Sequence, residues 1–156
     1  MFESLENTSL AIWVGESIWG YPFMLGMHIV GLAIVVGIFM MLNLRILGFN
    51  QGVSYAAFLS LYRLAWAGLL VNVLSGAALF SSQATIFIDS TPFLVKISCI
   101  ALGVLLALLL RREIKTHGAA WDAGTAAVRG SVRMLAALSA ICWLAAISAG
   151  RLIAYL

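Results

Sequence analysis

The chain has 156 residues, of which 63% are hydrophobic and only 10% are charged, and its mean hydropathy is strongly positive. A soluble domain carries about 25% charged residues, because a small body exposes much surface to water. The composition therefore excludes a soluble domain, a disordered chain and a disulfide-rich secreted module, and it predicts an integral membrane protein. The net charge of +3 does not indicate nucleic acid, since the basic residues lie mostly between apolar segments, where membrane topology explains them.

The predicted elements are all helices. The first stretch, 2–13, mixes apolar and polar residues, which predicts a short amphipathic helix on the membrane surface. Four long segments with few charges follow, and each is long enough to cross about 30 Å of hydrocarbon. The segment 111–131 has the composition of a solvated connection and is predicted to be partly helical. The predicted fold is one all-α domain, a four-helix transmembrane bundle with spans at about 18–44, 64–84, 92–110 and 132–155.

Positive charges are unevenly distributed among the connections. The connection between the first two spans carries Arg45 and Arg63, whereas the amino-terminal segment and the 85–92 connection carry no Lys or Arg. The connection between the last two spans carries most of the basic residues: Arg111, Arg112, Lys115, Arg129 and Arg133. Because cytoplasmic connections are enriched in Lys and Arg, both termini are predicted to lie in the periplasm, with the chain in the inner membrane of a bacterium.

Three residues that carry or can acquire a positive charge lie within the predicted spans, in the half nearest the periplasm: His28, Lys96 and Arg151. An ionisable group inside a bilayer is costly unless it is paired or hydrated, and so each is a functional candidate. Structural alternatives remain open. Arg151 can reach the headgroups, Lys96 can do the same or pair with Asp89, and His28 can hydrogen-bond a neighbouring helix near Asn72.

The surroundings of His28 favour a bulky, flat ligand. Gly68, Asn72 and Gly76 form a stripe on the second span, which either lets helices approach closely or leaves room beside the histidine. A haem b with His28 as axial ligand and Asn72 among its contacts accounts for this pattern. Its propionates would reach Lys96 and Arg151. His117 lies in the cytoplasmic connection, so the sixth ligand would be of another type, absent, or from a second subunit.

Two other interpretations compete with haem. Met24, Met27 and His28 offer thioethers and an imidazole that suit Cu(I), and Cys99 could join them, although methionine is also common apolar filler. The chain could instead be a non-catalytic subunit that anchors or assembles a larger membrane complex. Small-residue stripes at Gly103 with Ala107, and at Ala145 with Ala149, favour close packing in a homo-oligomer.

A series of short motifs follows the same order as in a known family: Glu16-Ser17 with Trp19, Tyr21-Pro22, His28 with Gly31, Leu44-Arg45-Ile46-Leu47-Gly48, Ser75-Gly76, Leu79-Phe80, Pro92-Phe93 with Lys96, and Gly150-Arg151-Leu152-Ile153-Ala154-Tyr155. Over nearly its whole length the chain resembles an uncharacterised family of four-helix bacterial inner-membrane proteins, from which it departs at Ile88-Asp89-Ser90. That family is distantly similar to copper-resistance membrane proteins and to the haem-containing protoporphyrinogen oxidase of bacteria. The oxidase pairs a first-helix histidine, matched by His28, with a third-helix lysine, matched by Lys96. The resemblance implies haem b binding and redox work.

The sequence thus predicts a haem b-binding subunit of the membrane, which transfers electrons or senses redox state near the periplasmic face. A periplasmic redox partner and a homo-oligomeric or larger assembly are expected with it. No motif for nucleophilic catalysis or phosphate binding stands out, so no catalytic residue and no reaction are assigned.

Overall fold

A computed structural model describes residues 2–49 and 51–153, and every regular element in those ranges is a helix. Four of the helices are long and apolar enough to cross a membrane, which confirms the predicted all-helical architecture with four spans. In chain order the helices are α1 (Phe2–Glu6), α2 (Ser9–Glu16), α3 (Gly20–Leu47), α4 (Tyr55–Ser81), α5 (Ala84–Ile88), α6 (Thr91–Asp122) and α7 (Gly130–Leu152).

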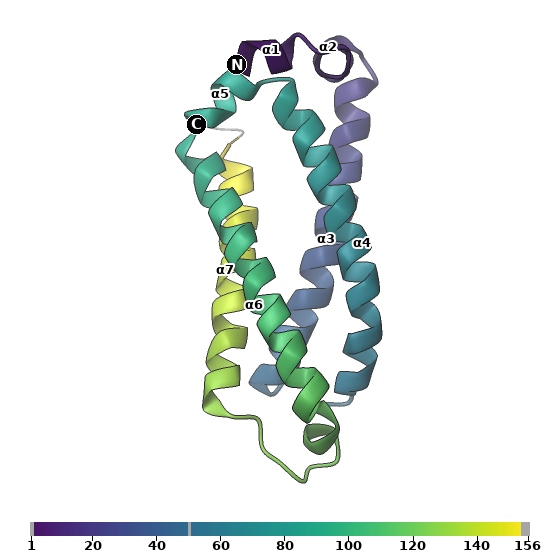
Figure 1. Cartoon of the computed structure of the whole chain (residues 1–156), viewed down its shortest axis with the longest axis vertical. Coiled ribbons are helices and arrows are strands. Elements are labelled where there is room, and N and C mark those ends of the chain that lie inside the picture. The colour runs from purple at the N-terminus through teal and green to yellow at the C-terminus, as the bar shows by residue number, and fades with distance from the viewer. Residues whose placement is uncertain (1, 50, 154–156) are drawn as a thin grey trace.

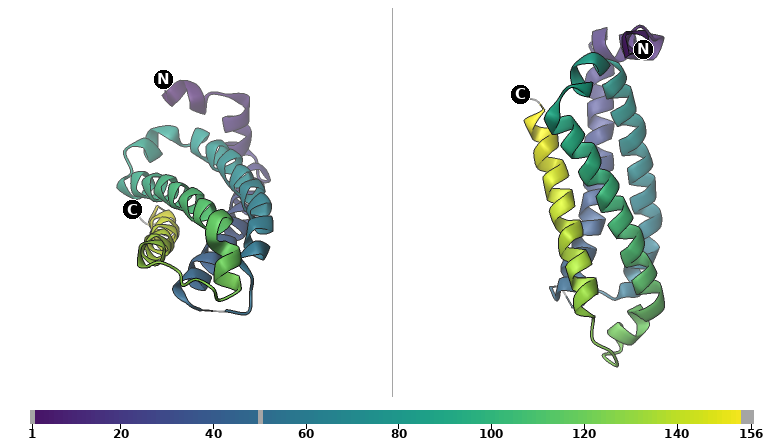
Figure 2. Two further views of the ribbon diagram at one scale, coloured as in Figure 1. Left: turned by 60° about the horizontal axis from the view of Figure 1, so that its bottom comes forward. Right: turned by 60° about the vertical axis from the view of Figure 1, so that its left-hand side comes forward.

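The four long helices form two antiparallel pairs, α3 with α4 and α6 with α7, joined by the short helix α5 (Figure 1). The helices α1, α2 and α5 lie across one end of the bundle, here called the upper end. The connections 48–54 and 123–129 form the opposite, lower end. Figure 2 shows the same arrangement from two further directions, and its right-hand view places α1 and the end of α7 both at the upper end.

The largest side chains of the core are aromatic, and they lie in the middle and lower parts of the bundle. The ring of Phe39 stacks on Trp143 with centroids 5.5 Å apart, and it contacts Tyr62 at the same separation. The Tyr62 hydroxyl donates a hydrogen bond of 2.9 Å to the carbonyl oxygen of Ala107, which ties α4 to α6. Gly103 makes room for Trp143, since a Cβ added at this glycine would lie 3.1 Å from the indole ring.

This packing corrects the expected role of the small-residue stripes. Gly103 and Ala107 face Trp143 and the core of their own chain, and Ala107 is 1% exposed. On α7, Ala149 is also buried within the chain. These residues are therefore used in folding the bundle and are not an outer face for a second copy. Oligomerisation itself stays a prediction.

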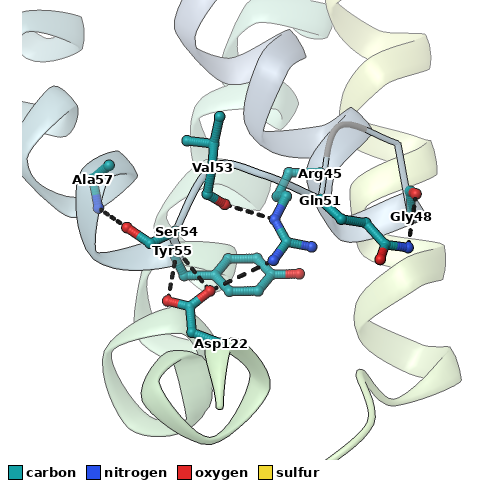
Figure 3. A network of polar contacts seen from close by, with 8 residues as sticks. All are labelled: Arg45, Gly48, Gln51, Val53, Ser54, Tyr55, Ala57 and Asp122. Carbon is teal, nitrogen blue, oxygen red and sulfur yellow. Dashed lines mark hydrogen bonds and ion pairs between the residues drawn. The ribbon is translucent and has the colours of Figure 1, made fainter. Parts of the chain in front are cut away.

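An ionic network closes the lower end (Figure 3). The Asp122 carboxylate, at the end of α6, accepts hydrogen bonds of 2.9 and 3.1 Å from the backbone amide of Tyr55, the first residue of α4. An acidic group at a helix N-terminus satisfies an otherwise unpaired N–H and complements the helix dipole. Arg45 lies 3.5 Å from Asp122, donates to the carbonyl oxygen of Val53 and covers the Tyr55 ring.

The helix ends differ from the predicted spans for a physical reason. Charges limit how far a segment extends into hydrocarbon, but a helix continues past them into water. The helix α4 therefore begins at Tyr55 and not at residue 64, capped by Ser54, and α6 continues to Asp122 beyond the predicted end at residue 110. The helix α3 covers Gly20–Leu47 in place of 18–44. The helix α7 ends at Leu152, and the last predicted residues of that span, 154 and 155, lie outside the described residues.

The amino-terminal stretch forms two short helices where one amphipathic helix is predicted. The helix α1 ends at Glu6, and Thr8 then begins α2 by accepting a hydrogen bond from the amide of Ala11 over 3.3 Å. Ala11 and Val14 of α2 are buried against the bundle, while Trp13 is 43% exposed.

Candidate functional site

His28 lies on α3 with its ring turned toward α4. Its Nδ1 is 3.0 Å from the backbone carbonyl oxygen of Asn72. A carbonyl oxygen only accepts hydrogen bonds, so Nδ1 is the nitrogen that carries the proton in this contact. The neutral ring consequently presents the lone pair of Nε2 on its other side, which is the side a metal or a proton donor can use.

Two polar side chains of α4 complete the contact with His28. The Asn72 amide nitrogen donates to the carbonyl oxygen of His28 over 2.9 Å, and the Ser75 hydroxyl lies 3.3 Å from Nδ1. The helices approach closely here because Gly31 has no side chain: an added Cβ would lie 2.7 Å from the backbone nitrogen of Asn72 and 2.8 Å from the carbonyl oxygen of Gly68. At Gly68 and Asn72 the stripe on α4 thus serves close packing.

Lys96 of α6 also contacts the His28 ring. Its Nζ lies 3.4 Å from Nε2 of His28 and can donate to the lone pair there. On α7, Gly150 lies against the end of the lysine side chain, since a Cβ added at Gly150 would be 3.5 Å from Cδ and Cε of Lys96. Lys96 thus contacts His28 and makes no ion pair with Asp89 in the described structure. Residues from α3, α4 and α6 therefore meet at the imidazole, and α7 packs against Lys96.

A cavity of about 360 Å³ adjoins the histidine in the upper half of the bundle. One wall is formed by three stacked phenylalanines: Phe80 and Phe93 have centroids 5.3 Å apart and an interplanar angle of 15°, and Phe87 lies 5.7 Å from Phe93. Gly76 keeps space beside the ring, since a Cβ there would lie 3.0 Å from Cε1 of His28. Among the described residues, the lining consists of Tyr21, Leu25, His28, Ile29, Leu32, Gly76, Leu79, Phe80, Phe87, Phe93, Lys96, Ala146, Ile147, Gly150, Arg151 and Ile153.

The charge of this lining is positive. Lys96 and Arg151 both line the cavity, and no Asp or Glu does so among the residues described. The three charged or titratable residues singled out from the sequence, His28, Lys96 and Arg151, are therefore brought together at one cavity. Asn72 supports the histidine from behind and does not itself line the cavity.

The residues of the copper interpretation are not gathered in the same way. Met24, Met27 and Cys99 are absent from the described cavity lining, and Met27 is 38% exposed on the outside of the bundle. Within the described ranges, no group of three or more His, Cys, Asp or Glu side chains is placed to hold a metal ion. His117 lies far from the cavity and contacts Glu113 over 3.5 Å on α6.

The contacts of several site residues are not indicated by the sequence. Ser75 and Gly150 stand in the motifs of the family resemblance, but a serine or glycine in a span is too common to indicate which side chain it contacts. Phe87 lies in the connection between two spans, and only its stacking with Phe80 and Phe93 reveals that it helps to close a cavity. The nearest signal in the sequence is the recurrence of phenylalanine on both sides of this connection.

The chain matches no protein-family model, no curated protein sequence and no solved structure. The resemblance carried by the motifs, and the cofactor that it implies, therefore stay predictions, and the candidate site depends on its own geometry.

Proposed function

We propose that the chain is a haem b-binding membrane protein that transfers electrons or senses redox state near the upper end of the bundle. The observation that carries this proposal is the orientation of His28, which lines the cavity: its Nδ1 is held by the Asn72 carbonyl, while Nε2 points away from that bond, toward Lys96. Histidines that ligate metals are oriented in this way, because a second hydrogen bond fixes the tautomer and raises the basicity of the ligating nitrogen.

The residues present fit a haem. The cavity offers one imidazole nitrogen, a flat aromatic wall and two cations, which match the iron, the ring and the propionates. Gly76 and Gly150 keep side chains out of the space next to His28 and Lys96. For iron to bind Nε2, the Lys96 ammonium must leave its present position 3.4 Å away. Its long, flexible chain can then place the charge against a carboxylate, as can that of Arg151.

The bound cofactor would supply one-electron chemistry at its iron. The residues of the chain would bind and orient it: His28 would hold the iron, and the backbone carbonyl of Asn72 holds His28. The stacked rings of Phe80, Phe87 and Phe93 exclude water from one side. The reduction potential of such a haem would depend on three features: the hydrogen bond to the ligating histidine, the burial of the cofactor and the nearby positive charge.

The excess of Lys and Arg at the lower end supports an orientation with that end in the cytoplasm. The upper end and both termini would then face the periplasm of a bacterium, with the chain in the inner membrane. In this orientation the cavity lies near the periplasmic face, where a soluble redox partner can approach it. We propose that the chain works there as a homo-oligomer or as a subunit of a larger membrane complex.

The test is the visible absorption spectrum of the detergent-purified protein, oxidised and dithionite-reduced, with the haem content determined by pyridine haemochrome. We expect a Soret band and b-type reduced peaks, which His28→Ala abolishes and His117→Ala leaves unchanged. A colourless protein from haem-replete cells would overturn the proposal. Full haem content in His28→Ala would overturn the assignment of the ligand.

A non-catalytic anchoring subunit is the second candidate, and one observation favours it. The polar contacts of His28 with Asn72 and Lys96 satisfy both ring nitrogens without any cofactor, and such bonds hold helices together in membranes. This candidate predicts a colourless protein that purifies with a partner. A determination of copper on the same sample distinguishes the haem protein and the anchoring subunit from the copper interpretation.

A further inference from the structure

The exposed residues of the described cavity lining all lie on two helices, α3 and α7. On α3 and α7, Tyr21, Leu25, Ile29 and Ile147 are 44%, 36%, 55% and 39% exposed, although each of them also lines the cavity. The lining residues of α4, α5 and α6 are all only partly exposed: Gly76, Leu79, Phe80, Phe87, Phe93 and Lys96. The cavity therefore reaches the outer surface of the bundle between α3 and α7.

The arrangement of the helices agrees with the greater exposure of the lining residues on α3 and α7. The helix α5 joins α4 to α6 at the upper end, whereas the upper ends of α3 and α7 stand apart (Figure 1). The helix α5 is itself held in place, since Glu6 of α1 accepts hydrogen bonds from the amide and the hydroxyl of Thr85 over 2.9 and 2.7 Å. Phe87 of α5 stacks on Phe80 and Phe93. The side between α4 and α6 is thus closed.

The open side faces hydrocarbon. Ile29 lies in the span α3 and Ile147 in the span α7, and an apolar surface at this level of a transmembrane bundle contacts lipid tails. Charge then restricts what can occupy the cavity. The described lining has two cations, the partly buried Lys96 and the exposed Arg151, and no carboxylate. A positive charge at this level of a membrane favours an occupant with anionic groups.

We propose that the cavity opens sideways into the bilayer between α3 and α7, and that its occupant arrives from the membrane as a planar amphiphile with carboxylate groups. Its flat apolar body lies along the phenylalanine wall, and its carboxylates lie at Lys96 and Arg151. The identity of this amphiphile as haem rests on the function proposed above, whereas the position of the opening does not.

Spin-label accessibility tests the opening without any cofactor. The label is attached to Leu79→Cys on the closed wall, in a background without Cys99 and Cys142, and the protein is placed in lipid bilayers. Collisions with oxygen, which concentrates in hydrocarbon, are compared with collisions with a water-soluble nickel chelate. We expect oxygen to dominate, and we expect Ile147→Trp to reduce oxygen collisions while Ile141→Trp does not. Ile141 is the matched control, because it is 61% exposed on the same helix and does not line the cavity.

Haem uptake tests the occupant. Apoprotein in bilayers is mixed with haemin dissolved in lipid, and the Soret band is followed with time. We expect Ile29→Trp and Ile147→Trp to take up haem roughly tenfold more slowly than Val30→Trp and Ile141→Trp, because a bulky ring obstructs the opening. Dominant nickel collisions, or an oxygen signal that Ile147→Trp leaves unchanged, would overturn the lateral opening. If Ile147→Trp reduces oxygen collisions but no variant develops a Soret band, the lateral opening is supported and haem is refuted as its occupant.

Discussion

His28 and Asn72 each bond to the backbone carbonyl of the other. The imidazole Nδ1 donates to the Asn72 carbonyl oxygen over 3.0 Å, and the Asn72 amide donates to the His28 carbonyl oxygen over 2.9 Å. The two hydrogen bonds have different roles. The first fixes the tautomer of the ring, and it uses a backbone atom that any residue at position 72 provides. The second only joins the two helices.

Asn72→Ala separates these two roles. It removes the bond to the His28 carbonyl and keeps the backbone oxygen that holds Nδ1, so we expect a loss of about 1 kcal/mol of stability with haem content retained. The measurements are unfolding in sodium dodecyl sulfate and pyridine haemochrome. Asn43→Ala is the control, because it breaks a similar buried bond, 3.1 Å to Ser139, away from the cavity. Loss of haem in Asn72→Ala alone would show that the carboxamide contacts the cofactor directly.

The close approach of α3 and α4 at Gly31 gives a second prediction. A methyl group at this position would lie 2.7 to 2.8 Å from backbone atoms of Asn72 and Gly68, which cannot move aside as a side chain can. We expect Gly31→Ala to destabilise the protein by roughly 1–3 kcal/mol. Gly37→Ala on the same helix has open space within 4 Å and is the control. Because alanine favours helices over glycine, Gly37→Ala should leave stability unchanged or raise it slightly. Equal effects in the two variants would contradict this account of the packing.

The sequence alone predicts which segments are long and apolar enough to cross a membrane, but it does not predict where their helices end. Long uncharged segments predict membrane crossing directly, because no other structure hides so many apolar residues. The ends depend on contacts between distant residues. The start of α4 at Tyr55 is stabilised by Asp122, 67 positions along the chain, and no local pattern reveals this partner.

The candidate site shows the same division. The sequence indicates His28, Lys96 and Arg151 because an ionisable residue is costly inside a bilayer. It does not indicate which of them touch, since the contact of Lys96 with His28 depends on how α6 rotates toward α3. Phe87 is not singled out at all, because its role is to shape the cavity.

The lower end of the bundle gives a third prediction. Asp122 accepts from the backbone amide of Tyr55 at the start of α4 and pairs with Arg45, so Asp122→Ala removes one of the caps of this helix and the carboxylate partner of the guanidinium (Figure 3). We expect a loss of about 1–2 kcal/mol of stability. Asp89→Ala, at the opposite end, should change little. Thermal unfolding in detergent measures both, and an Asp122→Ala variant as stable as Asp89→Ala would contradict the role of the cap.

The contact between α1 and α5 should depend on pH. The hydroxyl and the amide of Thr85 donate to Glu6 and hold the pKa of this carboxyl below its ordinary value of 4.5. A group whose pKa is lowered on folding stabilises the contact above its unfolded pKa, and the contribution is lost as pH falls through the lowered value. Spin labels at Ser4→Cys and Ile86→Cys should keep a narrow distance distribution at neutral pH and broaden in acid, below about 4.5.

Glu6→Gln tests this assignment, since the amide is uncharged at every pH. We expect the distance distribution of this variant to be the same at neutral and acid pH, while Glu16→Gln broadens in acid like the unmodified chain. Acid broadening that persists in Glu6→Gln would assign the pH dependence to another group.

Gly76 has no side chain and so leaves room for the His28 ring. A side chain at position 76 should therefore change the orientation of His28 more than it changes the stability of the fold. A Cβ at Gly76 would lie 3.0 Å from Cε1 and 3.3 Å from Nδ1 of the imidazole, and the ring can give way by rotating because it is a side chain. Rotation lengthens the bond from Nδ1 to the Asn72 carbonyl and turns Nε2 away from the cavity. We therefore expect Gly76→Ala to lower haem content and shift the reduced spectrum, with a change in stability of about 1 kcal/mol or less. The control is Gly26→Ala, which has no neighbouring atom within 4 Å and should keep full haem content. If Gly76→Ala binds haem with the spectrum of the unmodified protein, the orientation of His28 is not what determines binding.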